Sequence, residues 1–362
     1  MKNNILVLAP CPPGVGGIAT WSKMIGDYST NDQDNKLYFI NVGSNKVDNM
    51  NRNILQRVFY GFDDLFDVVK QVKNLLSHEK IDLFHMTVTG SLSLFRDRVL
   101  IKIAKKYNIP VVLHIRIGRI PSIKRKNTFE WIYFKHNLKK ADKIITIDET
   151  TYHSLKDDFG NVVNVINPID TKKYANYPSM HFQNGVITYV GWIIKEKGIE
   201  ELLSCFNKIH LNRPLLLKLV GPYNSKYISF LKKKYDFQNV QLFGKIGNAE
   251  TLQIVANSEI FVLPSYTEGC PNSVLESMLC KTPIIASNVG AIPEMLQDER
   301  GIVVKPQDED DLLEKIVWLL EDFDLQKKLI DNAYERVLSD FSLEHIYQVY
   351  KNIWNDIIGK RG

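Results

Sequence analysis

Paired cysteines are missing from this sequence. The 362-residue chain has four cysteines, Cys11, Cys205, Cys270 and Cys280. No Cys-x-x-Cys pair occurs and the spacings match no zinc motif, which argues against a zinc-stabilised or disulfide-stapled domain. We therefore expect free thiols in a reducing compartment.

Long apolar runs are missing as well. No stretch approaches the roughly 20 apolar residues that a membrane-spanning helix needs. The apolar run at the N-terminus, residues 5–10, is followed by Cys-Pro-Pro-Gly and is too short for the core of a signal peptide. We therefore expect a cytoplasmic protein, peripheral at most at the inner face of the membrane.

The sequence also lacks a strong overall charge, but its cations are unevenly distributed. Its 46 Lys and Arg against 41 Asp and Glu give a net charge of +5. Residues 116–140 hold eight basic residues and one acid, Glu130, so this segment alone carries +7. Such a patch can meet an anionic acceptor or a membrane surface, and the candidates are Arg116, Arg119, Lys124, Arg125 and Lys126. A helix with a solvated basic face is the alternative, and no nucleic-acid motif accompanies the patch.

Short apolar segments alternate with amphipathic segments along the whole chain, which predicts parallel, doubly wound α/β sheets. The length suits two domains, and the polar stretch 174–185 separates two similar halves. We expect one Rossmann-like domain over residues 1–172 and a second over 183–342. The expected strands are 5–9, 37–42, 83–86, 111–114, 143–147, 162–166, 186–191, 215–220, 240–243, 260–263, 283–286 and 302–304.

The most informative segment is 263–276, which follows an expected strand and opens a helix at Asn272. The first turn, near Ser273, would present backbone N–H groups to an anion such as a diphosphate. Gly269 would let the backbone approach a ligand closely. Glu268 precedes the helix and Glu276 lies in its first turns, where a carboxylate can accept two hydrogen bonds from a ribose diol. Either glutamate alone could instead be a solvated loop acid or a partner of the helix dipole.

The pair Glu268-x7-Glu276, followed by the segment 277–294, resembles the signature of the retaining GT-B glycosyltransferases of family 4, also called glycosyltransferase group 1. The resemblance implies two Rossmann-like domains facing across a cleft, with a C-terminal helix, 343–362, that crosses back to the N-terminal domain. It places Glu268 at the donor sugar as a catalytic residue and Glu276 at the nucleotide ribose. The loop around the donor sugar would be Glu268, Gly269, Cys270, Pro271 and Asn272.

A second segment, 189–198, resembles the strand-end motif in which that family holds the donor diphosphate. Lys197 matches the family's lysine, whereas Trp192 stands where the family has an arginine. Lys195 lies in the same loop and is the candidate substitute for that cation. The resemblance also implies that backbone near Gly221 and Ile246 contacts the nucleobase.

The N-terminal half contributes a glycine loop and a histidine. Gly16 and Gly17 resemble the family's loop at the donor phosphate, although Gly14-x-Gly16-x-x-Ala19 also fits a dinucleotide fingerprint. NAD fits less well, because no carboxylate follows the strand 37–42. His114 ends a strand, and the resemblance places such a histidine near the donor sugar and acceptor, where it would orient hydroxyls. A purely structural histidine is the alternative.

These observations predict transfer of a hexosyl group from a nucleotide diphosphate sugar to an acceptor hydroxyl with retention of configuration. The expected setting is bacterial exopolysaccharide, capsule or lipopolysaccharide synthesis, with a saccharide or lipid-linked saccharide as acceptor. No Asp-x-Asp stands at a suitable strand end, so we expect neither a metal nor another cofactor. A nucleotide-sugar epimerase of the same architecture and a catalytically inactive nucleotide-sugar-binding protein are the alternatives.

Overall fold

The computed structural model describes residues 2–14, 16–43, 54–91, 93–174 and 183–360, and it divides the chain into two compact units. The N-terminal unit comprises Met1–Pro168 and Glu344–Gly362, and the C-terminal unit comprises Ile169–Leu343. The domain boundaries predicted from the sequence are residues 172, 183 and 343. The two units are described separately below.

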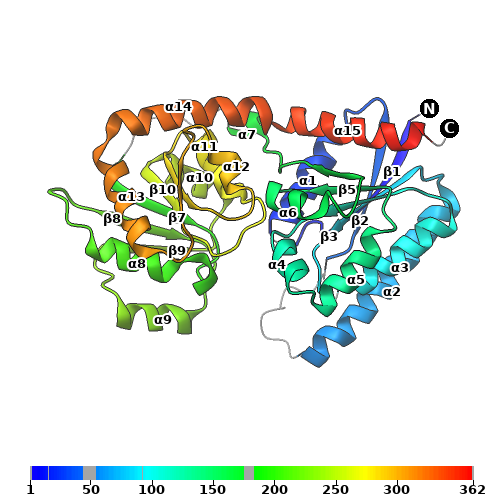
Figure 1. The fold of residues 1–362 in the computed structure, drawn as a ribbon, viewed down its shortest axis with the longest axis horizontal. Helices are drawn as coiled ribbons and strands as arrows, with labels where there is room; N and C mark the ends of the chain where they lie inside the picture. The colour runs from blue at the N-terminus through cyan, green and yellow to red at the C-terminus, as the bar shows by residue number, and fades with distance from the viewer. Residues whose placement is uncertain (1, 15, 44–53, 92, 175–182, 361–362) are drawn as a thin grey trace. The chain divides into compact units, whose positions relative to one another are not determined.

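The N-terminal unit is built on a six-stranded parallel sheet in the order β2-β1-β3-β4-β5-β6 (Figure 1). The chain runs from β1 to β2 on one side and then returns to β3 on the other, so the strand order reverses between β1 and β3. All six strands coincide with expected ones, which confirms the predicted α/β class. They are β1 Asn3–Ala9, β2 Asn35–Asn41, β3 Leu83–Val88, β4 Val111–Ile115, β5 Lys143–Thr146 and β6 Val162–Asn164.

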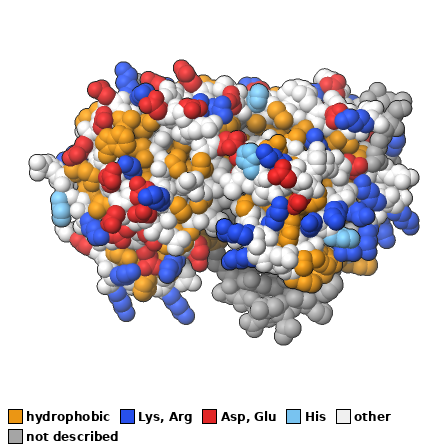
Figure 2. All heavy atoms as spheres, in the orientation of Figure 1, with side chains coloured by type: hydrophobic (Ala, Val, Ile, Leu, Met, Phe, Trp, Pro, Cys, Tyr) orange, Lys and Arg blue, Asp and Glu red, His pale blue; other side chains and the backbone are white. Residues whose placement is uncertain are grey.

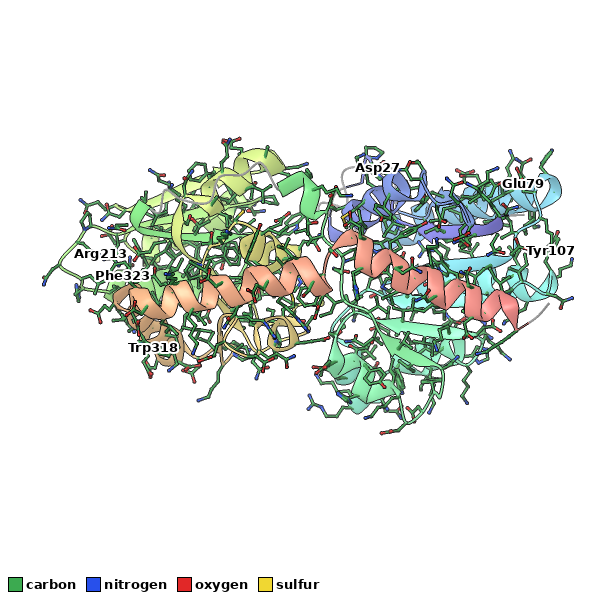
Figure 3. All side chains as sticks on the ribbon, turned by 90° about the horizontal axis from the view of Figure 1, so that it is seen from above. Asp27, Glu79, Tyr107, Arg213, Trp318 and Phe323 are labelled. Atoms are coloured by element: carbon green, nitrogen blue, oxygen red, sulfur yellow. The ribbon has the colours of Figure 1, made fainter. Side chains whose placement is uncertain are left out.

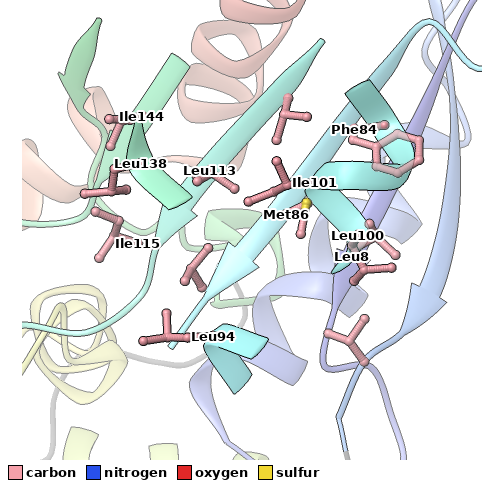
Figure 4. Packing of buried hydrophobic residues seen from close by; sticks show 14 of the residues in the cluster. Leu8, Phe84, Met86, Leu94, Leu100, Ile101, Leu113, Ile115, Leu138 and Ile144 are labelled. Atoms are coloured by element: carbon pink, nitrogen blue, oxygen red, sulfur yellow. The ribbon is translucent and has the colours of Figure 1, made fainter. Parts of the chain in front are cut away.

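The core of this unit lies between the central strands and the helices that cover them. Every residue of β3 and β4 is buried, because helices cover both faces of a parallel sheet. Figure 4 shows Met86 and Leu113 on these strands, with Leu100 and Ile101 of α3 (Ser93–Lys106) in the same cluster. This continuous apolar layer fixes the strand ends that carry the polar residues discussed below.

The helices of the N-terminal unit follow the predicted pattern, with one addition. The added helix is α4 (Ile120–Arg125), which was not predicted, although Pro121 suits a first helical turn. Thr128 caps the next helix by accepting a hydrogen bond from the Trp131 N–H, at 3.1 Å. The remaining helices are α1 Gly17–Ser29, α2 Ile54–His78, α5 Phe129–Leu138 and α6 Glu149–Leu155.

The last helix, α15 (Leu343–Gly359), returns to the N-terminal unit, as predicted (Figures 1 and 3). The Tyr347 hydroxyl donates to Asp32 Oδ2 at 2.8 Å. Lys351 Nζ lies 3.1 Å from Asp32 Oδ1 and 2.8 Å from Asp34 Oδ2. These contacts and the buried Trp354 fix α15 to the sheet of the first unit.

The C-terminal unit has a second parallel sheet in the order β12-β11-β10-β7-β8-β9. Here the order reverses between β7 and β10, which are neighbours although the sequence separates them by two strands. The strands again coincide with the expected ones: β7 Gln183–Val190, β8 Leu216–Val220, β9 Val240–Gly244, β10 Ser258–Leu263, β11 Ile284–Ser287 and β12 Ile302–Val304.

Helices surround this second sheet. The short elements η2 (Lys195–Lys197), α7 (Thr171–Tyr174) and α12 (Ile292–Leu296) were not predicted, because three to five residues carry no readable period. The longer helices are α8 Ile199–Lys208, α9 Ser225–Lys234, α10 Asn248–Ala256, α11 Asn272–Leu279, α13 Glu309–Glu321 and α14 Phe323–Asp340. Within the described part of the chain, no helix combines the length and apolar character needed to cross a membrane.

Candidate functional site

Two loops meet where the strand order of the C-terminal sheet reverses. One follows β7 and runs from Gly191 to Gly198, and the other follows β10 and runs from Pro264 to Pro271. Their strands pair directly, with Ile260 beside Ile187. Ligands of doubly wound sheets bind beyond the carboxyl ends of the strands at such a reversal. The topology therefore places the two segments singled out from the sequence at the expected binding position.

The backbone holds the two loops together. The Tyr266 N–H donates to the Glu196 carbonyl at 3.0 Å. Gly198 has φ 69° and packs so closely that a Cβ there would lie 2.0 Å from the Pro264 carbonyl oxygen. Only glycine fits this junction, which explains why the β7 loop ends in Lys197-Gly198.

Lys197 and Glu268 form the centre of this site. Lys197 Nζ lies 2.5 Å from Glu268 Oε1, and the Ser265 hydroxyl donates to the same oxygen at 2.7 Å. The lysine side chain is 21% exposed and the glutamate 13%, so the pair is partly shielded but can be reached from solvent. The residues predicted for the donor diphosphate and the donor sugar are thus brought together. Ser265 was missed, although it lies only three residues before Glu268.

The donor-sugar loop leads directly into α11, which begins at Asn272 as predicted. Cys270 and Pro271 are buried, and Ser273 lies in the first turn. The Gly269 carbonyl accepts a hydrogen bond of 2.7 Å from the Ala291 N–H. Gly290 has φ 58°, and a Cβ there would lie 2.3 Å from the Gly269 oxygen. Gly290 was not predicted to support this loop, although it lies shortly after the end of β11.

Glu276 is oriented by a short chain of polar side chains. The Asn248 amide donates to Glu276 Oε1 at 3.0 Å, and Lys173 Nζ donates to Asn248 Oδ1 at 3.1 Å. Asn248 begins α10 directly after the loop that contains Ile246. Neither Asn248 nor Lys173 was predicted. Asn248 could have been found, because it follows the end of β9, where nucleobase contacts were expected.

The remaining predicted residues of this unit lie on neighbouring strand ends. Trp192 is 41% exposed, and its backbone carbonyl accepts a 2.7 Å hydrogen bond from the buried Tyr189 hydroxyl. Lys195 is exposed on the same loop. Gly221 is buried at the end of β8, and Ile246 is half-buried beyond β9. A cation at position 195 is therefore open to solvent, whereas Lys197 is already held by Glu268.

Gly16 and Gly17 belong to the N-terminal unit. Gly16 precedes α1 and Gly17 begins it, directly after the loop that follows β1. They therefore lie at the reversal of the strand order in their own sheet, between β1 and β3. Their assignment to a donor phosphate stays a prediction.

His114 is buried near the carboxyl end of β4, and its assignment to the donor sugar and acceptor stays a prediction. Its side chain has no exposed surface. Nδ1 lies 3.1 Å from His85 Nε2, and Nε2 lies 3.3 Å from Arg116 Nη1. Burial, together with the positive charge of Arg116, holds the pKa of His114 well below its ordinary value. His114 is therefore neutral at physiological pH.

The expected basic surface also needs correction. Arg116 is 8% exposed and stacks over Trp21, with its guanidinium carbon 5.0 Å from the ring centroid, so its assignment to a surface was wrong. Arg119 pairs with Glu130 at 2.6 Å, and Lys124 pairs with Asp158 at 2.8 Å. Arg125 and Lys126 are exposed. Packing against Trp21 covers the first of these cations, and two others are paired with acids.

A different surface of the N-terminal unit combines exposed cations with exposed apolar side chains. It is formed by the outward faces of α3 and α5, and we call it the α3–α5 face (Figure 2). Phe95 of α3 contacts Tyr133 of α5, with ring centroids 4.7 Å apart, and the Arg98 guanidinium lies 5.1 Å from the same ring. The face consists of Phe95, Arg98, Lys102, Phe129, Ile132, Tyr133, His136, Lys139 and Lys140.

Comparison with known proteins identifies the C-terminal unit. Residues 182–336 match the family model described as glycosyl transferases group 1. The C-terminal unit is a group 1 glycosyl transferase domain. An uncharacterised glycosyltransferase of Methanocaldococcus jannaschii is 26% identical over 302 residues, which are 83% of this chain and 82% of the relative. A capsular polysaccharide biosynthesis glycosyltransferase of Staphylococcus aureus is 30% identical over 196 residues, about half of each chain (52% and 50%).

Solved structures show the same fold over the whole chain. Sucrose-phosphate synthase of Thermosynechococcus elongatus has a TM-score of 0.80 at 19% identity and covers 99% of this chain and 100% of its own. The Anabaena protein HepE, in complex with UDP and glucose, has a TM-score of 0.71 at 16% identity, covering 98% and 100%. These likenesses confirm the predicted two-domain GT-B fold.

Proposed function

We propose that this glycosyltransferase transfers a hexosyl group, with retention, from a nucleotide diphosphate sugar to an acceptor hydroxyl in the synthesis of a bacterial surface polysaccharide. The observation that carries the proposal is the Lys197–Glu268 pair at the reversal of the strand order, with Glu276 on the helix that follows. A cation for a diphosphate and a carboxylate for a sugar lie in two adjoining loops, and a carboxylate for a ribose lies on the helix that follows the second loop.

The reaction breaks the bond between the anomeric carbon and the diphosphate oxygen and forms a bond from that carbon to the acceptor oxygen. The nucleotide diphosphate leaves with added negative charge, and the proton of the acceptor hydroxyl passes to its departing phosphate oxygen or to solvent. Lys197 is suited to stabilise that charge, together with backbone N–H groups at the start of α11. Glu268, released from Lys197 when the diphosphate binds, would face the sugar. This division of roles requires no metal.

The relatives support the donor and the setting. The Staphylococcus aureus relative is named for capsular polysaccharide biosynthesis, and the Anabaena neighbour was crystallised with UDP and glucose. We therefore propose a nucleotide diphosphate hexose as donor and a saccharide or lipid-linked saccharide as acceptor. The proposed location is the cytoplasm, at the inner face of the membrane.

Replacing Glu276 with alanine should raise the dissociation constant of the donor about 100-fold or more. The reason is the loss of hydrogen bonds between a charged carboxylate and the ribose, each worth about 1.5–3 kcal/mol. Isothermal titration with UDP- and GDP-hexoses would measure this effect after a thermal-shift screen has identified the donor. Glu250→Ala is the matched control, because Glu250 is an exposed glutamate on α10 that was not assigned to the donor site.

An assay of nucleotide release separates the alternatives. A transferase releases nucleotide diphosphate in proportion to the acceptor supplied, whereas an epimerase changes the sugar without releasing nucleotide. An inactive binding protein would bind the donor normally and release nothing with any acceptor. Equal donor affinity of Glu276→Ala and the parent would show that the ribose site lies elsewhere.

We also propose that the α3–α5 face contacts an anionic membrane. Phe95 is 50% exposed, Phe129 73% and Ile132 55%, which is unusual for large apolar side chains. The pKa of His136 shows how close together the cations of this face lie. It is lowered first by the charge of Arg98, then by burial, and then by Lys140, Lys139 and Lys102. A surface that joins apolar side chains to concentrated positive charge fits the boundary of an anionic bilayer.

The triple variant Arg98→Gln, Lys102→Gln, Lys139→Gln should lose about 100-fold in partitioning to vesicles of phosphatidylglycerol and phosphatidylethanolamine. Each cation near an anionic surface contributes about 1 kcal/mol, so three removals weaken binding by about 3 kcal/mol. Cosedimentation at low and high salt would measure the loss, since screening should weaken the parent in the same way.

The matched control for this experiment lies on α9 of the other unit. Lys226→Gln, Lys232→Gln, Lys233→Gln removes the same charge from an exposed helix that also presents Phe230. If both triple variants lose binding equally, only net charge matters and the α3–α5 face has no special role. Salt-insensitive binding, or no binding of the parent, would overturn the proposal.

A further inference from the structure

Trp192 differs from the other tryptophans of the chain in the surroundings of its indole. It is 41% exposed just beyond the end of β7. In the part of the chain that the structure describes, no hydrogen bond, ring contact or cation contact involves its side chain. The other four indoles each contact a polar or charged group, namely those of Trp21, Trp131, Trp318 and Trp354. The indole of Trp192 is therefore available to a ligand.

The backbone of Trp192 is fixed on both sides, although its side chain is exposed. Its carbonyl oxygen accepts hydrogen bonds from the Tyr189 hydroxyl at 2.7 Å and from the Ile194 N–H at 3.1 Å. The next residue, Ile193, is buried, and its N–H donates to the Pro222 carbonyl at 3.0 Å. Because successive residues of an extended chain point to opposite sides, the burial of Ile193 turns the indole outward. The exposure of the indole follows from this geometry.

The indole lies beside the centre of the candidate site. Trp192 and Lys197 belong to the same short loop, in which the Lys197 N–H donates to the Ile194 carbonyl at 3.1 Å. Tyr189, whose hydroxyl holds the Trp192 backbone, lies close to Glu268. Burial and then the charge of Glu268 raise the pKa of Tyr189 well above its ordinary value. Trp192 is therefore near any ligand that binds at Lys197 and Glu268.

The chemistry of an indole face favours the sugar part of a nucleotide diphosphate hexose. The face carries the negative part of the ring quadrupole, which repels a diphosphate and attracts the weakly positive C–H groups on one side of a hexose ring. The nucleobase is expected at the ends of β8 and β9, near Gly221 and Ile246. Trp192 instead follows β7, in the loop of Lys197 and beside Glu268, the carboxylate assigned to the sugar.

We infer that Trp192 stacks on the hexose ring of the glycosyl donor and is a specificity-determining residue of this glycosyltransferase. The inference rests on the proposed function, because it takes the ligand at Lys197 and Glu268 to be a nucleotide diphosphate hexose. The indole covers one apolar side of the hexose, while the sugar hydroxyls stay open to polar groups such as Glu268. Affinity for the donor then depends on the sugar as well as on the nucleotide.

Trp192→Ala should raise the dissociation constant of the nucleotide diphosphate hexose about 3- to 10-fold and leave that of the nucleoside diphosphate within about twofold, as expected for the loss of one aromatic stacking contact. Isothermal titration with UDP and UDP-glucose, and with GDP and GDP-mannose, would measure both constants. Trp192→Phe should restore most of the affinity, because it keeps an aromatic face. Trp318→Ala is the matched control, since Trp318 is 45% exposed on α13, outside the predicted site (Figure 3).

Fluorescence tests the contact while the indole is kept. In Trp318→Phe, Trp192 is the remaining exposed tryptophan among the five of the chain, because Trp21, Trp131 and Trp354 are buried. Acrylamide quenches the emission of indoles that it can reach. Binding of the nucleotide diphosphate hexose should reduce this quenching, whereas UDP or GDP alone should leave it unchanged. This measurement still decides the inference if Trp192→Ala fails to fold.

Three results would overturn the inference. Equal weakening of UDP and UDP-glucose binding in Trp192→Ala would show that the indole contacts the nucleotide. A rise only in the KM of the acceptor would assign the indole to the acceptor, and unchanged binding and kinetics would leave it without a substrate contact. In each case the proposed function stands as long as Glu276→Ala weakens nucleotide binding. If the parent binds none of these nucleotides and nucleotide sugars, the proposed function fails together with the inference.

Discussion

Lys197→Ala should lower kcat/KM for glycosyl transfer about 100- to 1,000-fold. A preorganised cation at the leaving diphosphate has an effect of this size when it is removed from a site shielded from water. Lys197 is preorganised, because Glu268 holds its ammonium group at 2.5 Å and the Gly198 junction fixes the loop. Steady-state kinetics with the donor at saturating and limiting concentrations would measure the loss, most of which should appear in kcat.

The control is a second ion-paired lysine of the same unit. Lys234 pairs with Glu200 at 2.8 Å on the surface, 50% exposed, and lies outside the predicted site. Removing such a pair changes stability by at most about 1 kcal/mol, so Lys234→Ala should keep activity within about twofold of the parent. Lys197→Arg should recover part of the lost rate, since it retains the charge. Activity of Lys197→Ala within about threefold of the parent would reject the assignment.

The sequence was sufficient to locate the strands but not to identify the partners of the site residues. All twelve strands of the described chain were expected, because buried parallel strands are short apolar runs with clear ends. The start of α11 was also expected, since Pro271 and Asn272 are strong signals of a helix N-terminus. Lys197 and Glu268 were assigned to one site, but nothing in the sequence showed that they pair in the free protein.

The errors share one physical cause. Arg116 was assigned to a surface by its residue type and by its position after a strand, and the burial of His114 was not predicted either. Their burial depends on Trp21, His85, Tyr350 and Trp354, which come from three other elements far apart in the chain. Likewise, the α3–α5 face is formed by contact between two helices that more than 20 residues separate in the sequence. Local patterns do not report such contacts.

The buried histidines should make the N-terminal unit sensitive to acid. Both ring pKa values are depressed in the folded state, that of His85 to about 3, by burial first and then by the charge of Arg116. In the unfolded chain both rings have pKa values near 6.5. Below pH 6.5 the unfolded state therefore binds more protons than the folded state, and stability falls as the pH is lowered.

The free energy of unfolding should fall by about 2 kcal/mol per histidine between pH 8 and pH 5, or by about 4 kcal/mol for the pair. Each proton that only the unfolded chain binds lowers this free energy by about 1.4 kcal/mol per pH unit below pH 6.5. Urea unfolding followed by tryptophan fluorescence would report on this unit, since Trp21, Trp131 and Trp354 are its buried indoles. Trp192 and Trp318 of the other unit are 41% and 45% exposed and should change less.

His85→Gln should reduce this pH dependence to about half, because one of the two titrating rings is removed while an amide can still accept from Trp354 and donate to His114. His153→Gln is the control, since His153 is exposed on α6 and should leave the slope unchanged. A free energy of unfolding that stays flat from pH 8 to pH 5 would mean that the rings can be charged in the folded state.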